Sequence, residues 1–171
     1  RLGGGACAEH SHAINLWQHL SLSSGNGRIT SVSASFTFGT EKNTDYDAIA
    51  IFAFKSESGL QGRCIQDVVT RPARKWARVQ LEESAIDWCC GAGADGGDQI
   101  NIWSSDMLAP KNIVFIKTRP DDFITEMKAI EKATFTNDNC PIDLAFGVDT
   151  QKVILAAFES SSKGSFVDVS Y

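Results

Sequence analysis

Alternation of hydrophobic and polar residues is the strongest pattern along this chain, and it predicts β-strands. In residues 29–38 (ITSVSASFTF) every second position from Val32 onward is apolar, and serine or threonine occupies the positions between them. Such a segment fits an antiparallel strand that buries one face and exposes a row of hydroxyl groups on the other. Residues 14–22 also alternate, and the turn sequence SGNG at 24–27 lies between the two runs. We therefore expect a β-hairpin in this part of the chain.

Further segments are predicted to be strands of two kinds. Apolar residues fill nearly every position of segments 46–54, 112–117 and 152–158, as in central strands that are covered on both faces. Alternation recurs in segments 76–81, 99–103, 142–148 and 166–171. With the hairpin, these segments give about eight or nine strands, because turns rich in Gly, Ser, Asp or Pro separate them.

One segment has the periodicity of a helix rather than that of a strand. Phe123, Met127 and Ile130 recur at helical spacing within TRPDDFITEMKAIEKATF (118–135). A threonine suited to capping stands at the start of this segment, and acidic residues follow it at the positive end of the helix. We predict one amphipathic helix near residues 119–133 that lies on the sheet.

These patterns predict a mostly β protein, α+β by content. The predicted architecture is an antiparallel β-sandwich-like sheet of about eight or nine strands with the one helix, stabilised by disulfides. At 171 residues and 18.5 kDa, with 43% apolar and 22% charged residues, the composition is that of a globular protein. The sequence shows no internal repeat and no linker, so we expect residues 1–171 to form a single domain.

Charge and hydropathy argue against two classes of partner. The chain has 21 acidic and 16 basic residues, a net charge of −5, whereas nucleic-acid-binding proteins usually carry a basic excess. The longest apolar run, Ala48 to Phe54, is far shorter than a membrane-spanning helix. We therefore expect no nucleic-acid partner and no membrane span.

Five cysteines are spread along the chain without a CxxC pair, which argues against a zinc ribbon or a thioredoxin-type motif. They are Cys7, Cys64, Cys89, Cys90 and Cys140. Scattered cysteines of this kind are typical of disulfides in an oxidising compartment, so we predict a secreted, extracellular protein. The chain begins with Arg1 and shows no signal segment, which fits a processed product as well as a trimmed one. The odd number leaves one free thiol or allows an intermolecular disulfide, and the pairing stays open.

All three histidines lie in the stretch CAEHSHAINLWQH (7–19). His10 and His12 form an H-x-H pair, which on a strand would place both imidazoles on one face at a spacing that suits zinc or copper. His19 falls on the other face of such a strand, and the sequence offers no further histidine as a third ligand. We interpret the three as exposed or locally bonded, and we expect no metal and no cofactor. His10 and His12 remain an alternative metal or catalytic pair.

Residues 89–99 (CCGAGADGGDQ) are rich in glycine and other small residues, which predicts a long surface loop. The pattern is not a G-x-G-x-x-G that opens a helix, so it does not predict a dinucleotide site. Asp95 and Asp98 fit no EF-hand spacing. We expect disulfides to anchor this loop, with Trp88 and Trp103 at its two ends.

Tryptophans and arginines are the candidate binding residues. Trp17, Trp76 and Trp103 fall on the side of their predicted strands opposite to the neighbouring apolar residues. An exposed tryptophan can stack on a sugar ring or form a protein hot spot. Arginines cluster around Trp76, and such a cluster is suited to an anion. The candidate binding set is Trp17, Trp76, Trp88, Trp103, Arg74 and Arg78.

Two functions follow as hypotheses. The first is a secreted, non-enzymatic recognition protein of the lectin, toxin or virulence-effector kind. It would bind a cell-surface or extracellular protein or carbohydrate through loops on a cross-linked β scaffold. This hypothesis is favoured because no catalytic motif is found, such as a Gly-x-Ser-x-Gly elbow. The second is a secreted metal-dependent or hydrolytic enzyme that uses His10 and His12.

Overall fold

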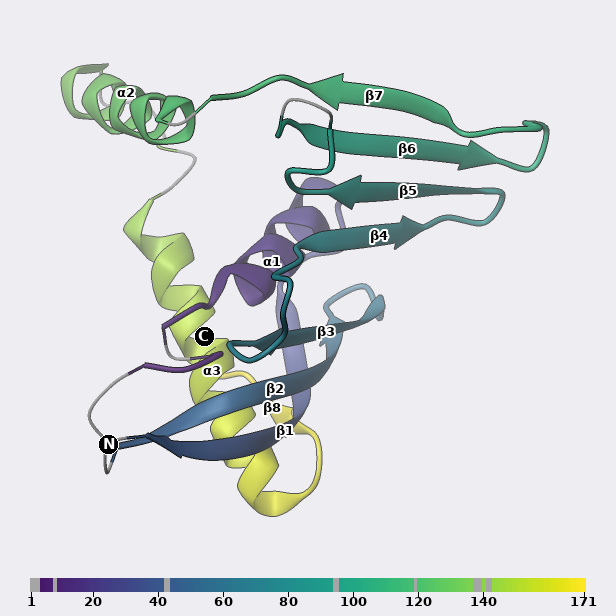
Figure 1. Cartoon of the computed structure of the whole chain (residues 1–171). Coiled ribbons are helices and arrows are strands. Elements are labelled where there is room, and N and C mark those ends of the chain that lie inside the picture. Colours follow the sequence, from purple (N-terminus) through teal and green to yellow (C-terminus); the bar gives the residue numbers. More distant parts are fainter. Residues whose placement is uncertain are drawn as a thin grey trace. The chain divides into compact units, whose positions relative to one another are not determined.

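The computed structural model describes residues 4–7, 9–41, 44–93, 96–118, 120–136, 140 and 143–171. Within these ranges, helices and strands follow one another along the chain as Figure 1 shows. In chain order they are α1 (His12–Ser23), β1 (Ile29–Glu41), β2 (Thr44–Ser56), β3 (Gln61–Asp67), β4 (Trp76–Gln80), β5 (Ser84–Cys89), β6 (Asp98–Ser104), β7 (Lys111–Phe115), α2 (Asp121–Thr136), α3 (Leu144–Lys163) and β8 (Val167–Asp168).

The chain divides into two compact units, and each is described by itself. The first unit combines two separate stretches, Arg1–Val69 and Asp143–Tyr171, and the second unit is Thr70–Ile142. One four-stranded sheet has the strand order β3-β2-β1-β8, and the other has the order β4-β5-β6-β7. Every strand pair in the described residues is antiparallel. That the whole chain is a single domain stays a prediction.

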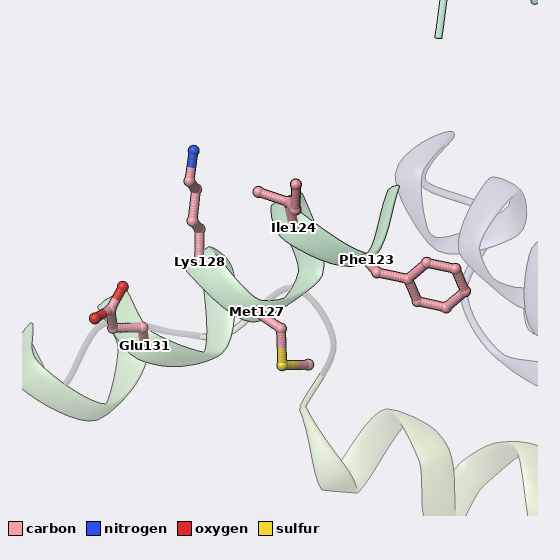
Figure 2. A pocket seen from close by; sticks show the side chains of 5 residues that line it. All are labelled: Phe123, Ile124, Met127, Lys128 and Glu131. Carbon is pink, nitrogen blue, oxygen red and sulfur yellow. The ribbon is translucent and has the colours of Figure 1, made fainter. Parts of the chain in front are cut away.

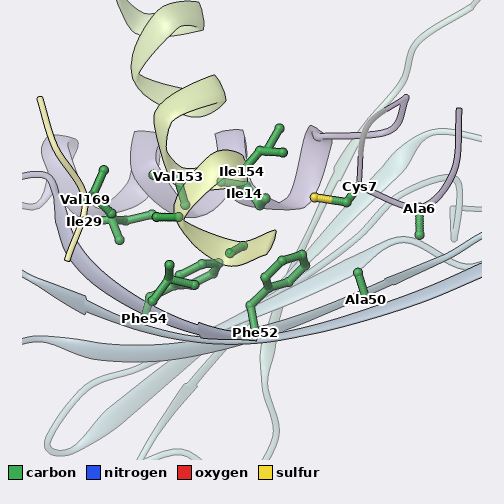
Figure 3. Packing of buried hydrophobic residues seen from close by; sticks show 13 residues of the cluster. Ala6, Cys7, Ile14, Ile29, Ala50, Phe52, Phe54, Val153, Ile154 and Val169 are labelled. Carbon is green, nitrogen blue, oxygen red and sulfur yellow. The ribbon is translucent and has the colours of Figure 1, made fainter. Parts of the chain in front are cut away.

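The hydrophobic core of the first unit lies between its sheet and two helices (Figure 3). Helix α3 packs on β1, and α1 packs on α3 and β3. Phe52 and Phe54 of β2 are buried together with Ile14 of α1 and with Val153 and Ala157 of α3. Burying a large apolar side chain contributes about 1.5–3 kcal/mol, so this cluster is what joins the two stretches of the first unit.

Strands β1 and β2 confirm the predicted strands at 29–38 and 46–54. They pair over most of their length, and Val32 lies opposite Phe54 on the face that the helices cover. The other face of β2 is open, because the Ile51 side chain is 49% exposed. The expectation that β2 is covered on both faces is therefore wrong.

The second unit is an antiparallel meander followed by helix α2. Strands β4, β6 and β7 confirm the strands predicted at 76–81, 99–103 and 112–117. Strand β7 is, however, a largely exposed edge strand, so the expectation that 112–117 is a central strand covered on both faces is wrong. Strand β5 (Ser84–Cys89) was not predicted, although it pairs with both β4 and β6 and so lies inside the sheet. Helix α2 confirms the helix predicted near 119–133, but none of its residues is buried.

Helix α1 occupies the segment that alternation predicts to be a strand. Its buried residues are Ile14, Gln18 and Ser21, which recur at helical spacing. Two of these three are polar, so a search for hydrophobic periodicity does not find the stripe. Gln18 donates from Nε2 to Thr150 Oγ1 at 2.9 Å, and Ser21 donates from Oγ to the Gly27 carbonyl at 2.7 Å. These hydrogen bonds make the buried positions acceptable for polar side chains.

Helix α3 replaces the strands that were predicted at 142–148 and 152–158. Both of its capping signals are visible in the sequence. Asp143 accepts a hydrogen bond from the Phe146 N–H at 2.7 Å at the helix start, and Gly164 ends the helix with a φ of 65°. A short apolar run does not distinguish a buried strand from a buried helix, and the caps are the evidence that decides between them.

The predicted fold, one disulfide-stabilised β-sandwich-like sheet with one helix, is wrong. The described residues form two four-stranded antiparallel sheets and three helices, an α+β arrangement. The strand predicted at 166–171 is reduced to Val167–Asp168. All five cysteines are free thiols, so no disulfide joins these elements. No helix within the described ranges is long and apolar enough to span a membrane.

Candidate functional site

The candidate site is the segment Glu9–His12, here called the histidine arm, which leads into α1. The side chains of Glu9, His10 and His12 are exposed, and His12 is the first residue of the helix. The imidazole rings of His10 and His12 have their centroids 6.3 Å apart. The arm is therefore a loop and helix start that presents two imidazoles and a carboxylate to solvent, and it is not the strand edge that the sequence predicts.

Asp47 of strand β2 anchors the chain just before the histidine arm. The Ala6 N–H donates to the Asp47 carbonyl at 2.6 Å, and the Cys7 N–H donates to the Asp47 carboxylate at Oδ2. A methyl group added to Gly5 would clash with this same carboxylate, so glycine is needed for the chain to approach it. Asp47 itself is buried, with 5% of its surface exposed.

Gln66 of strand β3 anchors the chain just after the histidine arm. Its Oε1 accepts a hydrogen bond from the Ala13 N–H at 2.8 Å, in the first turn of α1. The N-cap residue Ser11 makes no side-chain capping hydrogen bond, so Gln66 satisfies one of the free N–H groups of the helix start. Among the residues that the structure describes, Gln66 Nε2 is the buried side-chain atom without a hydrogen-bond partner.

Two thiols, the buried Cys7 and the half-buried Cys64, lie near the first anchor. Burial raises the pKa of Cys7 to about 12, and the Asp47 carboxylate adds to the rise. Burial likewise raises the pKa of Cys64 to about 12, with a further contribution from Cys7. Both thiols are therefore protonated at neutral pH and are poor nucleophiles. They belong to the core, and their predicted role in disulfides is wrong.

The histidine arm is suited to proton transfer. Imidazole is the side chain that most readily accepts and releases a proton near neutral pH, and acid–base residues must be held within hydrogen-bond reach of their substrate. A substrate can reach His10 and His12 because both side chains are exposed. Their position is restrained because the chain is hydrogen-bonded on both sides of the arm. No group of three or more His, Cys, Asp or Glu side chains within the described ranges is placed to hold a metal ion.

Trp17, a predicted binding residue, is not on an exposed strand. It lies on α1 and packs on Phe54 with a ring-centroid distance of 5.2 Å. Trp88 is half-buried on β5, and its Nε1–H donates to Asp98 Oδ2 at 3.1 Å. These two tryptophans stabilise their own units in the structure. Their predicted binding roles stay untested predictions.

Trp76, Arg78 and Trp103 share one face of the sheet of the second unit. Arg78 pairs with Asp87 of β5 in the strand register. Side chains two positions apart along a strand lie on the same face, which places Trp76 and Trp103 on the face of this pair. Asp87 accepts hydrogen bonds from Trp103 Nε1 at 2.8 Å and from the Arg78 guanidinium at 3.4 Å. The Arg74 guanidinium lies 5.8 Å from the Trp76 ring centroid. The structure thus brings four predicted binding residues near one another, and binding by them stays a prediction.

Hydrogen bonds and an ion pair, rather than disulfides, close the loop at 89–98. Asp98 Oδ1 accepts from the Gly91 N–H at 3.0 Å and pairs with Lys117 Nζ at 3.1 Å. Burial acts to raise the pKa of Asp98, but these contacts and the Trp88 hydrogen bond together outweigh it and lower the pKa below its usual value. Asp95, considered above as a cation ligand, lies outside the described residues. The prediction that disulfides anchor this loop is wrong.

The exposed side of α2 carries a shallow apolar surface (Figure 2). Its lining residues are Phe123, Ile124, Met127, Lys128 and Glu131. All five come from one helix, so this surface is the unburied stripe of α2 rather than an enclosed pocket. It contains no side chain suited to proton transfer near neutral pH, and we do not assign catalysis to it.

No protein-family model matches the chain, and no curated protein sequence matches it. Its fold resembles solved oxidoreductases. The NAD binding oxidoreductase from Klebsiella pneumoniae has a TM-score of 0.81 and 15% identity, over 99% of this chain and 52% of that chain. Levoglucosan dehydrogenase in its apo form has a TM-score of 0.80 and 16% identity, over 98% of this chain and 52% of that chain. The aldose-aldose oxidoreductase from Caulobacter crescentus, complexed with glycerol, has a TM-score of 0.78 and 15% identity, over 96% of this chain and 48% of that chain.

At these identities the likeness shows the fold alone, and the chain spans about half the length of each of these proteins. The resemblance points to the fold of an enzyme family. The prediction of a secreted, non-enzymatic recognition protein of the toxin, lectin or effector kind is therefore wrong. The alternative prediction of a metal-dependent or hydrolytic enzyme names a reaction class that differs from that of these neighbours. An extracellular location is not tested by the fold, and the disulfides on which it was based are absent from the structure.

The described residues do not fit a dinucleotide cofactor. Dinucleotides bind where a parallel strand leads through a glycine-rich turn into a helix, whereas every strand pair here is antiparallel. Glycines do precede α1, but Gly5 packs against the Asp47 carboxylate, whose negative charge would repel a pyrophosphate. The likeness is thus to a part of the oxidoreductase chains that is built from antiparallel sheet and helices.

Proposed function

We propose that this chain is the substrate-binding part of an NAD(P)-dependent oxidoreductase that acts on sugars or polyols, with the histidine arm as its acid–base group. The observation that carries the proposal is the exposed pair His10 and His12, held at both ends by buried side chains, on a fold shared with oxidoreductases. The chain's similarity to these proteins supports the reaction class, and the histidine arm supports the place where the reaction would occur.

The names of two structural neighbours support the substrate class. One is levoglucosan dehydrogenase in complex with NADH and L-sorbose, and another is an aldose-aldose oxidoreductase complexed with glycerol. All of the compounds named there carry hydroxyl groups on adjacent carbons. A polyhydroxylated substrate offers donors and acceptors that suit the imidazoles of the histidine arm and the carboxylate of Glu9.

Proton transfer is the part of the reaction that this chain can supply. Oxidation of an alcohol removes a hydride from carbon and a proton from the hydroxyl oxygen, and a neutral imidazole is suited to accept that proton. In the reverse direction the imidazolium returns the proton to the oxygen of the carbonyl. The hydride acceptor does not fit the described residues, as shown above, so we derive no step through it.

The proposal is tested by turnover of the full-length protein, produced recombinantly, with NAD+ or NADP+ and a panel of aldoses, polyols and anhydro sugars. We expect reduced nicotinamide to form with at least one of these substrates. Because general acid–base catalysis contributes about 10²–10⁴-fold to a rate, we expect His10→Ala or His12→Ala to lower kcat by about that factor.

His19→Ala is the matched control, because His19 is an exposed imidazole further along the same helix. We expect its turnover to equal that of the native protein. The proposal is abandoned if no sugar or polyol is oxidised, or if the three histidine variants have the same activity as the native protein.

A further inference from the structure

Asp47 and Gln66 hold the two ends of the histidine arm, and we propose that they are positioning residues that fix the directions of the His10 and His12 imidazoles. The inference rests on the proposed function of the arm as an acid–base group. It goes beyond that function because neither Asp47 nor Gln66 is exposed to substrate. Both would act through the main chain of the arm, one before it and one after it.

The placement of Asp47 supports this role. A carboxylate is an unfavourable choice for a buried position unless hydrogen bonds satisfy it. Its Oδ2 accepts from the Cys7 N–H, a main-chain group, and its carbonyl accepts from the Ala6 N–H. The clash that a methyl group on Gly5 would make shows how closely the chain is packed against it. Strand β2 therefore defines where the histidine arm begins.

The unpartnered amide of Gln66 supports the role independently. Its Oε1 accepts from the Ala13 N–H, whereas its buried Nε2 has no partner in the residues that the structure describes. A buried donor without a partner is unfavourable, and an apolar side chain of similar size would avoid that cost but would also give up the hydrogen bond to the Ala13 N–H. A residue that binds the helix start at the expense of stability is typical of a functional site rather than of a core.

The two anchors are on neighbouring strands. Strands β2 and β3 pair in an antiparallel register in which Gln66 lies opposite Ala50, three residues after Asp47. Cys7, before the histidine arm, and Ala13, after it, are therefore hydrogen-bonded to neighbouring strands of the same sheet. Catalytic groups are most effective when packed secondary structure fixes them to within a fraction of an ångström, and this sheet can do so for the histidine arm.

The test is a histidine NMR titration of the chain labelled in its imidazole rings, which needs no catalytic activity. The variants are Asp47→Ala and Gln66→Leu, each of which removes one anchor. We expect the His10 and His12 resonances to lose their native dispersion and to move to the positions of unstructured histidine. His19, on the same helix, is the internal control and is expected to keep its native resonance.

Conservative variants and a matched control separate positioning from stability. Asp47→Asn and Gln66→Glu keep an oxygen that can accept the main-chain N–H, so we expect both to restore the native resonances of His10 and His12. Ser160→Ala removes two hydrogen bonds elsewhere in the first unit, where the buried Ser160 donates to the Ser165 carbonyl and accepts from the Ala34 N–H. This variant is expected to leave all three histidines unchanged. If Asp47→Ala does not fold, Gln66→Leu decides, because it removes the other anchor, the Oε1 that accepts from the Ala13 N–H.

The proposal is overturned if the His10 and His12 resonances are the same in the anchor variants as in the native chain, or if Ser160→Ala shifts them equally. The outcome is separate from that of the proposed function. If the imidazoles respond to the anchors but no sugar is oxidised, the positioning role stands and the oxidoreductase proposal fails. In an active protein, the anchor variants should lower kcat.

Discussion

Buried polar residues shape the candidate site at the scale of single residues. Asp47 and Gln66 would both be unfavourable in a core without hydrogen-bond partners. Each of them, however, accepts a hydrogen bond from a main-chain N–H next to the histidine arm. Gly5 completes this arrangement because the absence of a side chain lets the main chain approach Asp47. The reach and direction of His10 and His12 thus depend on side chains about 40 and 55 positions away.

We predict that Gly5→Ala destabilises the first unit by about 1–3 kcal/mol, because the added methyl group overpacks the site against Asp47. Urea unfolding followed by circular dichroism measures the change in the free energy of unfolding.

Gly147→Ala is the matched control. Gly147 lies within α3, and a methyl group there would meet no other atom within 4 Å. Since alanine favours a helix over glycine by about 1 kcal/mol, we expect this variant to be more stable than the native chain. Equal stability of the two glycine variants would show that Gly5 is not packed against Asp47.

Helices α1 and α3 show at the scale of elements why hydrophobic periodicity misassigns part of this chain. The buried stripe of α1 includes Gln18 and Ser21, which bond to Thr150 Oγ1 and to the Gly27 carbonyl. The apolar residues that remain alternate with polar ones, which is the pattern of a strand. In α3 the apolar run is short, and only the caps at Asp143 and Gly164 reveal its true length. Helix α2 was predicted correctly because its stripe is purely apolar.

We predict that Asp143→Ala destabilises the first unit by about 1 kcal/mol, since it removes the side-chain acceptor of the Phe146 N–H at the start of α3. The free energy of unfolding in urea is the measurement. Gln151→Ala, an exposed position on the same helix, serves as the control and is expected to change stability by less than about 0.5 kcal/mol. An equal effect of both substitutions would argue against a capping role for Asp143.

At the scale of the whole molecule, the first of the two units has a core that two distant stretches of chain build together. Phe52 and Phe54 come from the first stretch, whereas Val153 and Ala157 come from the second. The residues between these stretches form the second unit, with its own sheet. An α+β unit of this kind cannot form until α3 is available, because α3 and α1 supply the layer that covers the sheet.

We predict that Val153→Ala, which removes two buried methyl groups, destabilises the first unit by about 2 kcal/mol. Amide hydrogen exchange should then show lower protection in α3 and equally in β1 and β2. Strands β5 and β6 of the second unit should keep their native protection, because regions with separate cores open separately. Loss of protection in all of these strands together would favour the single domain that the sequence predicts.

The sequence by itself determined the elements whose formation depends on local pattern. Three segments predict the correct element: the alternation at 29–38, the apolar run at 46–54 and the helical stripe near 119–133. In each of them the spacing of the apolar residues along the sequence matches the repeat of the element that forms. The sequence also identified His10 and His12 as a pair of interest. It did not show that they lie in a loop and at a helix start rather than on a strand.

Only the tertiary structure decided the covering layer, the state of the cysteines and the geometry of the site. Whether a segment such as 152–158 becomes strand or helix depends on the surface that it must cover, and that surface is made by residues far away in the chain. The anchors Asp47 and Gln66 likewise act through main-chain N–H groups, which every residue except proline carries and which leave no trace in the sequence. Long-range hydrogen bonds to the main chain therefore place the histidine arm, and a periodicity of side chains cannot reveal them.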